Sequence, residues 1–466
     1  MSIRIERSKL TTEQKELIRK LLCLYPQEAP QFSKQKNFYT EAKEPILFFE
    51  VDDKYINIPY AFGNTLLQSF PNMYLQKHKM AFHFTKNLLD HQVEVVEEAR
   101  VHLQTKGTTT LGTYPGSGKT VMGAYLSVTV WPDPSQCEMV LVLHPMTVLN
   151  ASWANTFREF TDARVWVVGD EPVPSHMPNV IVCLDQRIDK IPPGVLESIG
   201  FLILDEAHKL CTPSKVHALL ATQPKYVVAE TATLSRDDGM ESMIHSMCGN
   251  HAITRISTKP FNVIKLMTGI CPEVVQGAKG ADWNALVDTI YKDPIRNKMI
   301  VEMIRDNIAK GFKIIVLTLR KDHVTMLQGM LREIGIRCDV MLGTKKSYSD
   351  SDCLLGTVSK IGTGFDERTN CPDFGGRRAD LLIYCASTKK EAVMEQNFGR
   401  VCRASFPSVI HLVDDNPIIK KHWTICKKWY ESRNGILHEV KIPKQTRTYN
   451  IDGTCSGIVE MKIADE

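Results

Sequence analysis

Short apolar runs separated by helix-like stretches dominate the chain between about residues 85 and 255. Runs of this kind, rich in β-branched residues, are typical of strands that are buried on both faces of a sheet. Their alternation with helical periods indicates a parallel sheet covered by helices, so we predict an α/β domain at residues 81–255. The candidate strands are TTTLGT (108–113), MVLVLH (139–144), VIVCL (180–184), FLILD (201–205) and YVVAE (226–230).

The same alternation returns in the second half of the chain. Residues 256–295 contain prolines and glycines that interrupt any long period, and we expect a connecting segment there. A helix pattern and four further apolar runs then predict a second α/β domain at 296–440, followed by a C-terminal tail at 441–466. The candidate strands are KIIVLT (313–318), CLLGTV (353–358), LLIYCA (381–386) and VIHLV (409–413).

The first 80 residues show a different pattern. A polar, helix-like start is followed by ILFFEVDDKYINIP (46–59), in which apolar runs flank Asp52 and Asp53 as in a hairpin. We expect a small accessory domain at residues 1–80, whose function the sequence does not show.

A basic aromatic stretch, KKHWTICKKWYESR, lies at residues 420–433. Trp423, Cys426 and Tyr430 recur at helical spacing, which predicts the buried stripe of a helix with its lysines in solvent. The alternative is a basic, aromatic extension of a nucleic-acid groove.

Composition narrows the class of protein. Of the 466 residues, 43% are apolar and 24% charged, which indicates a folded globular chain rather than a disordered or fibrous one. A net charge of +4 is too small to indicate a polyanionic partner, so any basic groove must be local. The chain has no signal-peptide pattern and no apolar run long enough to span a bilayer, so we expect an intracellular protein without a membrane partner.

The segment GTYPGSGKT (112–120) follows a predicted strand and precedes a helix pattern, which is the setting of a phosphate-binding loop. It departs from G-x-x-x-x-G-K-[ST] at Thr113, where the pattern has glycine. In such a loop, backbone N–H groups meet the phosphates, the lysine reaches the β- and γ-phosphates, and the final hydroxyl binds Mg²⁺. The sequence therefore predicts a site for ATP and Mg²⁺, with an ordinary strand-to-helix turn as the alternative. The predicted ligands in this loop are Gly116, Ser117, Gly118, Lys119 and Thr120.

Two acids end the predicted strand FLILD, in the sequence FLILDEAH (201–208). Nucleotide hydrolysis needs one acid for the metal and one for the attacking water, so we assign Asp205 to Mg²⁺ and Glu206 to the water. A solvated acidic strand end is the alternative. The four apolar residues before Asp205 argue against it, because they indicate a central strand, and ligands bind at the carboxyl ends of such strands.

DEAH at 205–208, with GSGKT before it and TAT at 231–233 after it, resembles the motifs of superfamily 2 DExH-box helicases. The resemblance implies two tandem RecA-like domains and an ATP hydrolase. In LLDHQ it implies that Gln92 contacts the adenine base. It further implies that His208, Thr231 and Thr233 couple the nucleotide site to strand binding. VLVLHPMTVLNASW and CLDQR resemble strand-contacting segments, which implies nucleic-acid contacts by Pro145, Met146, Thr147, Gln186 and Arg187.

The second half of the chain carries the remaining helicase motifs. IIVLTLRKDHVTML resembles motif IV, and TVSKIGTGFDE resembles motif V, which implies a strand contact by Thr357 and nucleotide contacts by Gly364 and Asp366. QNFGRVCR resembles motif VI, Q-x-x-G-R-x-x-R, with Gln396 as a further nucleotide contact. Arg400 and Arg403 are three residues apart, so we expect them on one face of a helix turn. The resemblance implies that they stabilise transition-state charge on the γ-phosphate, as an arginine finger does.

TATLSRDDGMESMIHSMCG (231–249) narrows the resemblance to helicases of large cytoplasmic DNA viruses, including the poxvirus transcript-release helicase and its African swine fever virus and algal virus counterparts. It implies that the protein binds nucleic acid without sequence specificity, DNA rather than RNA, and that it contacts transcription machinery. It also implies that the protein is located in the host cytoplasm or the virion. An RNA helicase or a duplex translocase that does not unwind remains open. So does a nucleotide-gated clamp or assembly factor of a transcription complex. Glu230, before TAT, departs from the serine, leucine or glycine that is commoner there.

Overall fold

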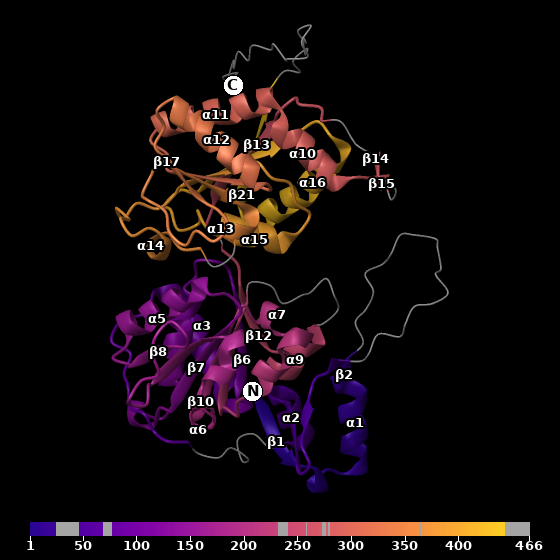
Figure 1. The fold of residues 1–466 in the computed structure, drawn as a ribbon, viewed down its shortest axis with the longest axis vertical. Coiled ribbons are helices and arrows are strands. Elements are labelled where there is room, and N and C mark those ends of the chain that lie inside the picture. The colour runs from indigo at the N-terminus through magenta and orange to yellow at the C-terminus, as the bar shows by residue number, and fades with distance from the viewer. Residues whose placement is uncertain are drawn as a thin grey trace. The chain divides into compact units, whose positions relative to one another are not determined.

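In a computed structural model the chain forms two compact units, Met1–Arg255 and Ile256–Glu466 (Figure 1). The structure describes residues 1–24, 46–68, 77–231, 241–257, 259–272, 276–277, 280–362 and 365–442. Within those ranges, none of the helices combines the length and the apolar character that crossing a membrane would require.

The first unit is built on a seven-stranded sheet in which all neighbouring strands run parallel. In sheet order the strands are β12 (Ala252–Arg255), β6 (Thr108–Thr113), β11 (Tyr226–Glu230), β10 (Ile199–Asp205), β7 (Met139–His144), β9 (Val180–Leu184) and β8 (Val165–Val167). The five predicted strands are confirmed and occupy the centre. The two that were not predicted, β8 and β12, are short strands at the two edges.

Helices cover both faces of this sheet, because alternate strand side chains enter different cores. Val140 and Val142 of β7 pack with α3 (Asp90–Lys106), α4 (Lys119–Thr129) and α5 (Val148–Phe160). Leu141 and Leu143 enter the opposite core. Helices α7 (Ala207–Leu210), α8 (Val216–Leu220) and α9 (Glu241–Cys248) contribute to this second core, with α6 (Pro193–Leu196) packed against it. A strand buried on both faces favours apolar and β-branched residues, which explains the apolar runs of β7, β9 and β10 in the sequence.

The N-terminal residues form a small antiparallel sheet of β1 (Ser2–Glu6), β5 (Tyr55–Pro59) and β4 (Glu50–Val51), with α1 (Thr12–Leu22) and α2 (Tyr60–Leu67). Two further strands, β2 (Cys23–Leu24) and β3 (Ile46–Leu47), pair with each other; in the sequence they lie between α1 and β4. The predicted hairpin is confirmed, since Asp52 Oδ1 accepts a hydrogen bond of 2.9 Å from the N–H of Lys54 in its turn. The apolar side chains of this module join the core that contains Leu141, so it belongs to the first unit rather than forming a core of its own.

His217 of α8 ties this module to the rest of the unit. Its Nδ1 lies 2.9 Å from Glu50 Oε1 and its Nε2 lies 3.1 Å from Asp189 Oδ1, in the short 3₁₀ helix Asp185–Lys190. Hydrogen bonds to Glu50 and then Asp189 raise the pKa of His217. The bridge is mostly exposed, so it contributes little free energy.

We expect His217→Gln to lower the free energy of unfolding at pH 6 by about 0.5 kcal/mol and to leave it unchanged at pH 9. A histidine whose pKa rises on folding stabilises the fold below its unfolded pKa, and this contribution disappears as the pH rises through the folded pKa. Urea denaturation at the two pH values measures the difference, with His176→Gln, at an exposed position, as the control. An equal loss at both values would contradict this assignment.

The second unit repeats the architecture of the first. Its seven parallel strands are, in sheet order, β17 (Cys338–Met341), β18 (Cys353–Thr357), β16 (Ile314–Thr318), β19 (Leu381–Tyr384), β20 (Ser408–Val413), β13 (Phe261–Met267) and β21 (Gly435–Lys441). Its helices are α10 (Trp283–Lys292), α11 (Pro294–Ala309), α12 (Lys321–Glu333), α13 (Val358–Gly362), α14 (Glu367–Asn370), α15 (Glu391–Phe398) and α16 (Pro417–Ser432). A small antiparallel pair, β14 (Gln276–Gly277) with β15 (Gly280–Ala281), precedes α10.

The structure differs from the expected connecting segment at 256–295. This stretch supplies β13, which pairs with both β20 and β21, and also α10. The strand was missed because Asn262 and Lys265 interrupt its apolar run. Lys265 is accommodated by an ion pair of 2.8 Å with Glu439 on the neighbouring strand β21, a long-range contact that the local sequence does not reveal.

Helix α16 confirms the buried-stripe interpretation of residues 420–433. Trp423, Cys426 and Tyr430 are buried in the core of the second unit. Lys420, Lys421, Lys427 and Lys428 are all exposed. The lysines therefore form the solvated face of the helix.

Candidate nucleotide-binding site

The loop between β6 and α4 has the backbone of a phosphate-binding loop. Gly116 and Gly118 have φ of 89° and 85°, in the left-handed region that favours glycine. A Cβ atom at Gly118 would also lie 2.2 Å from Gln92 Nε2. Because α4 begins at Lys119, the N–H groups of its first turn and the positive end of its dipole face the loop. This arrangement attracts phosphate groups.

Thr113 stands where the phosphate-loop pattern has glycine, and the structure accommodates its side chain. It is the last residue of β6, and its backbone is not left-handed, so a side chain is tolerated. Its hydroxyl lies 2.7 Å from the hydroxyl of Ser117, within the buried part of the loop. Its carbonyl oxygen accepts a hydrogen bond of 2.7 Å from Lys119 Nζ, and the carbonyl of Tyr114 lies 3.4 Å from the same ammonium. Thr113 therefore stabilises the loop and helps to orient Lys119.

We expect Thr113→Val to weaken nucleotide binding about fivefold, or about 1 kcal/mol, because it leaves the buried Ser117 hydroxyl without this partner. Thr113→Ser keeps the hydroxyl and is expected to bind as the wild type does. Equilibrium titration with a fluorescent ADP analogue measures both affinities. Equal affinities of the two variants would show that the hydroxyl contact does not matter.

Gln92 lies on α3 and is buried against the loop. Its Nε2 donates to the carbonyl oxygen of Ser117 at 3.0 Å, and its Oε1 accepts from the N–H of Leu89 at 3.0 Å. The structure thus brings Gln92 and the phosphate loop together, although they are far apart in the sequence. Its contact with adenine stays a prediction.

The two acids lie at the carboxyl end of β10. Asp205 Oδ2 accepts a hydrogen bond of 2.8 Å from Trp153 Nε1 on α5. Burial raises the pKa of Asp205 to about 6, and the neighbouring charge of Glu206 acts in the same direction. Glu206 has φ of 52°, a left-handed conformation that is strained for a residue with a side chain. Such strain occurs at functional sites more often than elsewhere.

His208 joins Glu206 to the next strand. Its Nδ1 lies 2.8 Å from Thr231 Oγ1 and 3.4 Å from Glu206 Oε2. The structure therefore brings together three of the residues expected to act on water or to couple the nucleotide site to strand binding. The fourth, Thr233, lies outside the described residues.

The expected strand-contacting segments follow β7 and β9, which are neighbours, so both lie at the carboxyl edge of the sheet. Pro145 and Met146 are half-buried, whereas Thr147 and Gln186 are exposed. Arg187 Nη1 donates to Asp170 Oδ1 at 2.9 Å and to the carbonyl of Val168 at 2.8 Å. These side chains share one edge with the phosphate loop, but their contact with nucleic acid stays a prediction.

In the second unit, the arginines of QNFGRVCR contact the segment expected to be motif V. Arg400 donates to the carbonyl oxygens of Gly362 and Phe365 at 2.5 Å each. Arg403 forms an ion pair with Asp366. Arg403 and then Arg378 hold the pKa of Asp366 below its usual value, although burial acts against the charged form.

The other expected residues of this half lie nearby in the chain. Thr357 ends β18 and is buried, and Gln396 lies half-buried on α15. Gly364 lies outside the described residues. The arginines differ from the expected helix turn: α15 ends at Phe398, and both lie in the turns that follow. Successive i to i+3 hydrogen bonds replace the helix there, from Arg400 N–H to Asn397 O (3.2 Å) and from Ala404 N–H to Val401 O (3.0 Å).

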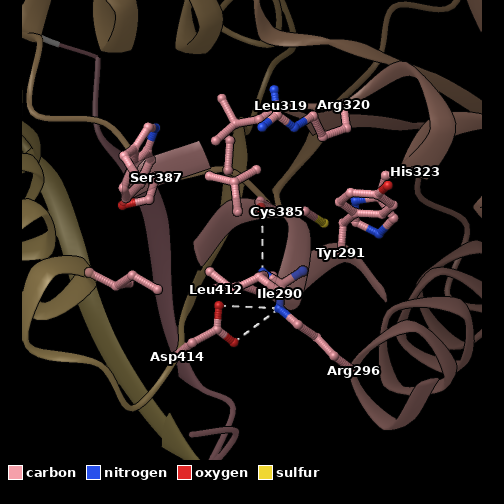
Figure 2. A pocket seen from close by; sticks show the side chains of 14 residues that line it. Ile290, Tyr291, Arg296, Leu319, Arg320, His323, Cys385, Ser387, Leu412 and Asp414 are labelled. Carbon is pink, nitrogen blue, oxygen red and sulfur yellow. Dashed lines mark hydrogen bonds and ion pairs between the residues drawn. The ribbon is translucent and has the colours of Figure 1, made fainter. Parts of the chain in front are cut away.

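Figure 2 shows a cavity of the second unit in which Arg296 points toward Asp414. Arg296 Nε lies 3.0 Å from Asp414 Oδ1, and its Nη2 donates to the carbonyl of Cys385 at 3.1 Å. The enclosed space of about 20 Å³ has room for roughly one water molecule, so it cannot hold a nucleotide. This buried pair joins α11 to the segment after β20, and we assign it to the fold rather than to catalysis.

Comparisons with known proteins identify a family and several relatives of this chain. A sequence profile of the family described as DEAD/DEAH box helicase matches residues 90–240. The chain is 26% identical over 392 residues to "Putative helicase 161L" of Invertebrate iridescent virus 6, with 77% of this chain and 84% of that protein covered. It is 29% identical over 378 residues to "Putative helicase 055L" of Frog virus 3, with 78% and 82% covered.

Residues 90–240 form a DEAD/DEAH box helicase domain. Among solved structures, S. cerevisiae Dbp5 bound to RNA and ADP BeF3 is similar in fold, with a TM-score of 0.51 and 14% sequence identity; the match covers 76% of this chain and 94% of that chain. That likeness agrees with the assignment of both sheets to RecA-like domains. A domain of this family implies ATP, and typically Mg²⁺, as ligands.

Three features of the site were not predicted from the sequence of this chain. They are the Trp153 hydrogen bond to Asp205, the hydroxyl contact between Thr113 and Ser117, and the burial of Glu230 beside the acids. The first two depend on packing between elements that are distant in the chain or on side-chain rotamers. The sequence did contain an indication of the third feature, because Glu230 is a charged residue at the end of an otherwise apolar strand.

Proposed function

We propose that this protein couples ATP hydrolysis to movement along a nucleic-acid strand, and that the strand is DNA. The observation that carries the proposal is the meeting of a phosphate loop with two acids at one edge of the first sheet. Strands β6 and β10 flank β11, so Thr113 and Asp205 end at the same edge. That edge is where ligands bind in open α/β sheets.

The residues at this edge fit a metal-bound nucleotide. Mg²⁺ prefers oxygen ligands, and Thr120 and Asp205 would supply a hydroxyl and a carboxylate. Bound Mg²⁺ supplies positive charge that offsets the charge of the phosphate oxygens. Lys119 would bind the β- and γ-phosphates, the N–H groups of Gly116 to Gly118 would bind the remaining phosphate oxygens, and Gln92 would recognise the base. Glu206 would orient the attacking water and accept its proton.

The second unit would contribute the groups that stabilise the transition state. We propose that Arg400 and Arg403 leave their present partners in motif V and bind the γ-phosphate oxygens, with Gly364, Asp366 and Gln396 completing the nucleotide contacts. Loss of the γ-phosphate on hydrolysis would then release them. A cycle of this kind can couple the nucleotide state to hold and release of a strand, with His208, Thr231 and Thr233 as the coupling residues.

Strand binding is proposed for Pro145, Met146, Thr147, Gln186, Arg187 and Thr357. Contacts of this kind with the backbone carry no base information, so binding is expected to be independent of sequence and sensitive to salt. Because the relatives are putative helicases of large DNA viruses, we also propose a role in viral transcription, such as transcript release, or in replication. The RNA in the Dbp5 structure makes RNA the alternative track to test.

A panel of ATPase rates tests this function directly. We expect single-stranded or duplex DNA to stimulate the rate about tenfold or more over the rate without polymer, and the stimulation to fall as salt rises. Stimulation by RNA alone would instead assign an RNA helicase. Strand displacement from a tailed duplex then separates unwinding from translocation. Rates that no polymer changes would contradict the motor and favour a nucleotide-gated clamp.

A further inference from the structure

Glu230 ends β11 with its side chain in the interior of the first unit. Only 1% of the residue is exposed, and its Oε1 has no hydrogen-bond partner among the described residues. An acid that is buried without a partner costs several kcal/mol in its charged form, so proteins retain such groups where they serve a purpose.

Strand register, a close contact with α4 and the spacing of residues along α4 together locate the carboxyl group of Glu230. Glu230 pairs in register with Asp205 on β10, so the two side chains leave adjacent strands on the same face of the sheet. A Cβ atom at Gly123 of α4 would lie 2.5 Å from Glu230 Oε1, so the carboxyl group lies against that helix. Gly123 is four residues after Lys119 and three after Thr120, and these positions share one face of a helix. The carboxyl group therefore lies about one helical turn from the predicted phosphate and metal ligands.

Electrostatics agree with this placement. Burial raises the pKa of Glu230 well above its ordinary value, and the charge of Asp205 acts in the same direction, whereas Lys119 acts in the opposite one.

Gly123, the glycine that faces Glu230, also lowers the stability of the protein. A glycine inside a helix is less favourable than alanine. At Gly123, however, any side chain would collide with the Glu230 carboxyl group. The helix thus leaves room for an acid that has no structural partner.

Glu138 provides a contrast within the same sheet. It is also 1% exposed and also faces a glycine, since a Cβ atom at Gly200 would lie 2.1 Å from its Oε2. It precedes β7, at the opposite, amino end of the strands. Its Oε1 accepts a hydrogen bond of 3.1 Å from the N–H of Lys77, so its burial has a structural reason. Among the described residues, no such hydrogen bond explains the burial of Glu230 Oε1. Glu230 also lies at the end of the sheet where the nucleotide is proposed to bind.

We propose that Glu230 is an outer acceptor of the magnesium site: it accepts a hydrogen bond from a water molecule on the ion that Thr120 and Asp205 hold. This inference rests on the proposed function. Mg²⁺ keeps several water ligands when it binds to proteins, and the protons of these waters need acceptors. Residues in this outer position orient the inner ligands, and their loss typically lowers metal affinity 10- to 100-fold.

The test compares Glu230→Gln with its matched control, Glu138→Gln, by titrating a fluorescent ADP analogue in excess Mg²⁺ and in EDTA. Mg²⁺ is expected to increase the affinity of the wild type for the analogue, and we expect this increase to be about tenfold smaller in Glu230→Gln. In EDTA the two proteins should bind the analogue equally well. Glu138→Gln should keep the full gain. Electron paramagnetic resonance of Mn²⁺ with ADP measures the metal directly and should show the same loss.

Two outcomes would overturn the inference. One is a Glu230→Gln variant with the metal dependence of the wild type; the other is an equal loss of affinity with and without metal, which would make Glu230 a support of the loop alone. Glu230→Met, which matches the volume without a carboxyl group, repeats the test if the glutamine variant does not fold. A wild-type protein that binds no nucleotide in either condition would refute the proposed function itself, so the two failures are distinguishable.

Discussion

Replacing Glu206 by glutamine is expected to lower the rate of ATP hydrolysis about a thousand-fold while nucleotide affinity stays within about twofold of the wild type. Glutamine keeps the size of the side chain but cannot accept a proton from water. A positioned general base contributes about 10²- to 10⁴-fold to a rate. The left-handed backbone of Glu206, with φ of 52°, fixes the direction of its side chain, and glutamine can adopt the same conformation at similar cost.

Turnover at saturating ATP and polymer measures this effect, and titration with the ADP analogue measures binding. Glu197→Gln is a suitable control, because it makes the same chemical change at an exposed residue before the amino end of the same strand. If Glu206→Gln turned over ATP at the wild-type rate, the base would have to be another group. Loss of nucleotide binding in the variant would instead indicate that Glu206 supports the fold of the site.

The parts of the fold that could be predicted are those with a local cause. β7 and β10 are apolar up to their last residues because both of their faces are buried, and the glycines of the phosphate loop are required by backbone φ at Gly116 and Gly118. Strand β13 could not be found in this way. Its Lys265 fits a sheet only because Glu439, 174 residues away in the chain, neutralises it.

The same distinction applies to the candidate site. Lys119 and Asp205 belong to short patterns whose spacing reflects their chemistry, so the sequence indicated them directly. Trp153 carries no such pattern: it is one of several apolar residues on α5, and only the packing of that helix brings its N–H to Asp205. Likewise, Gly123 resembles any helix glycine until the Glu230 carboxyl group is found against it.

Replacing Lys119 by alanine is expected to weaken nucleotide binding at least about 100-fold, or about 3 kcal/mol, and to abolish measurable hydrolysis. Loss of one member of a buried, hydrogen-bonded charge pair typically costs about 2–5 kcal/mol. The ammonium group is already oriented toward the loop by the carbonyl oxygens of Thr113 and Tyr114, at 2.7 and 3.4 Å, so little reorganisation is needed when phosphates arrive.

Lys106→Ala is the matched control, because Lys106 is an exposed lysine at the end of α3. Lys119→Arg tests the geometry, because it keeps the positive charge but replaces the compact ammonium group by a planar guanidinium group. We expect its affinity to lie between those of Lys119→Ala and the wild type. Equal affinity of Lys119→Ala and the wild type would remove the phosphate loop from the site. Weak binding by Lys119→Ala, together with tight binding and slow turnover by Glu206→Gln, would separate the two halves of the chemistry: one residue holds the phosphates, and the other acts on the water.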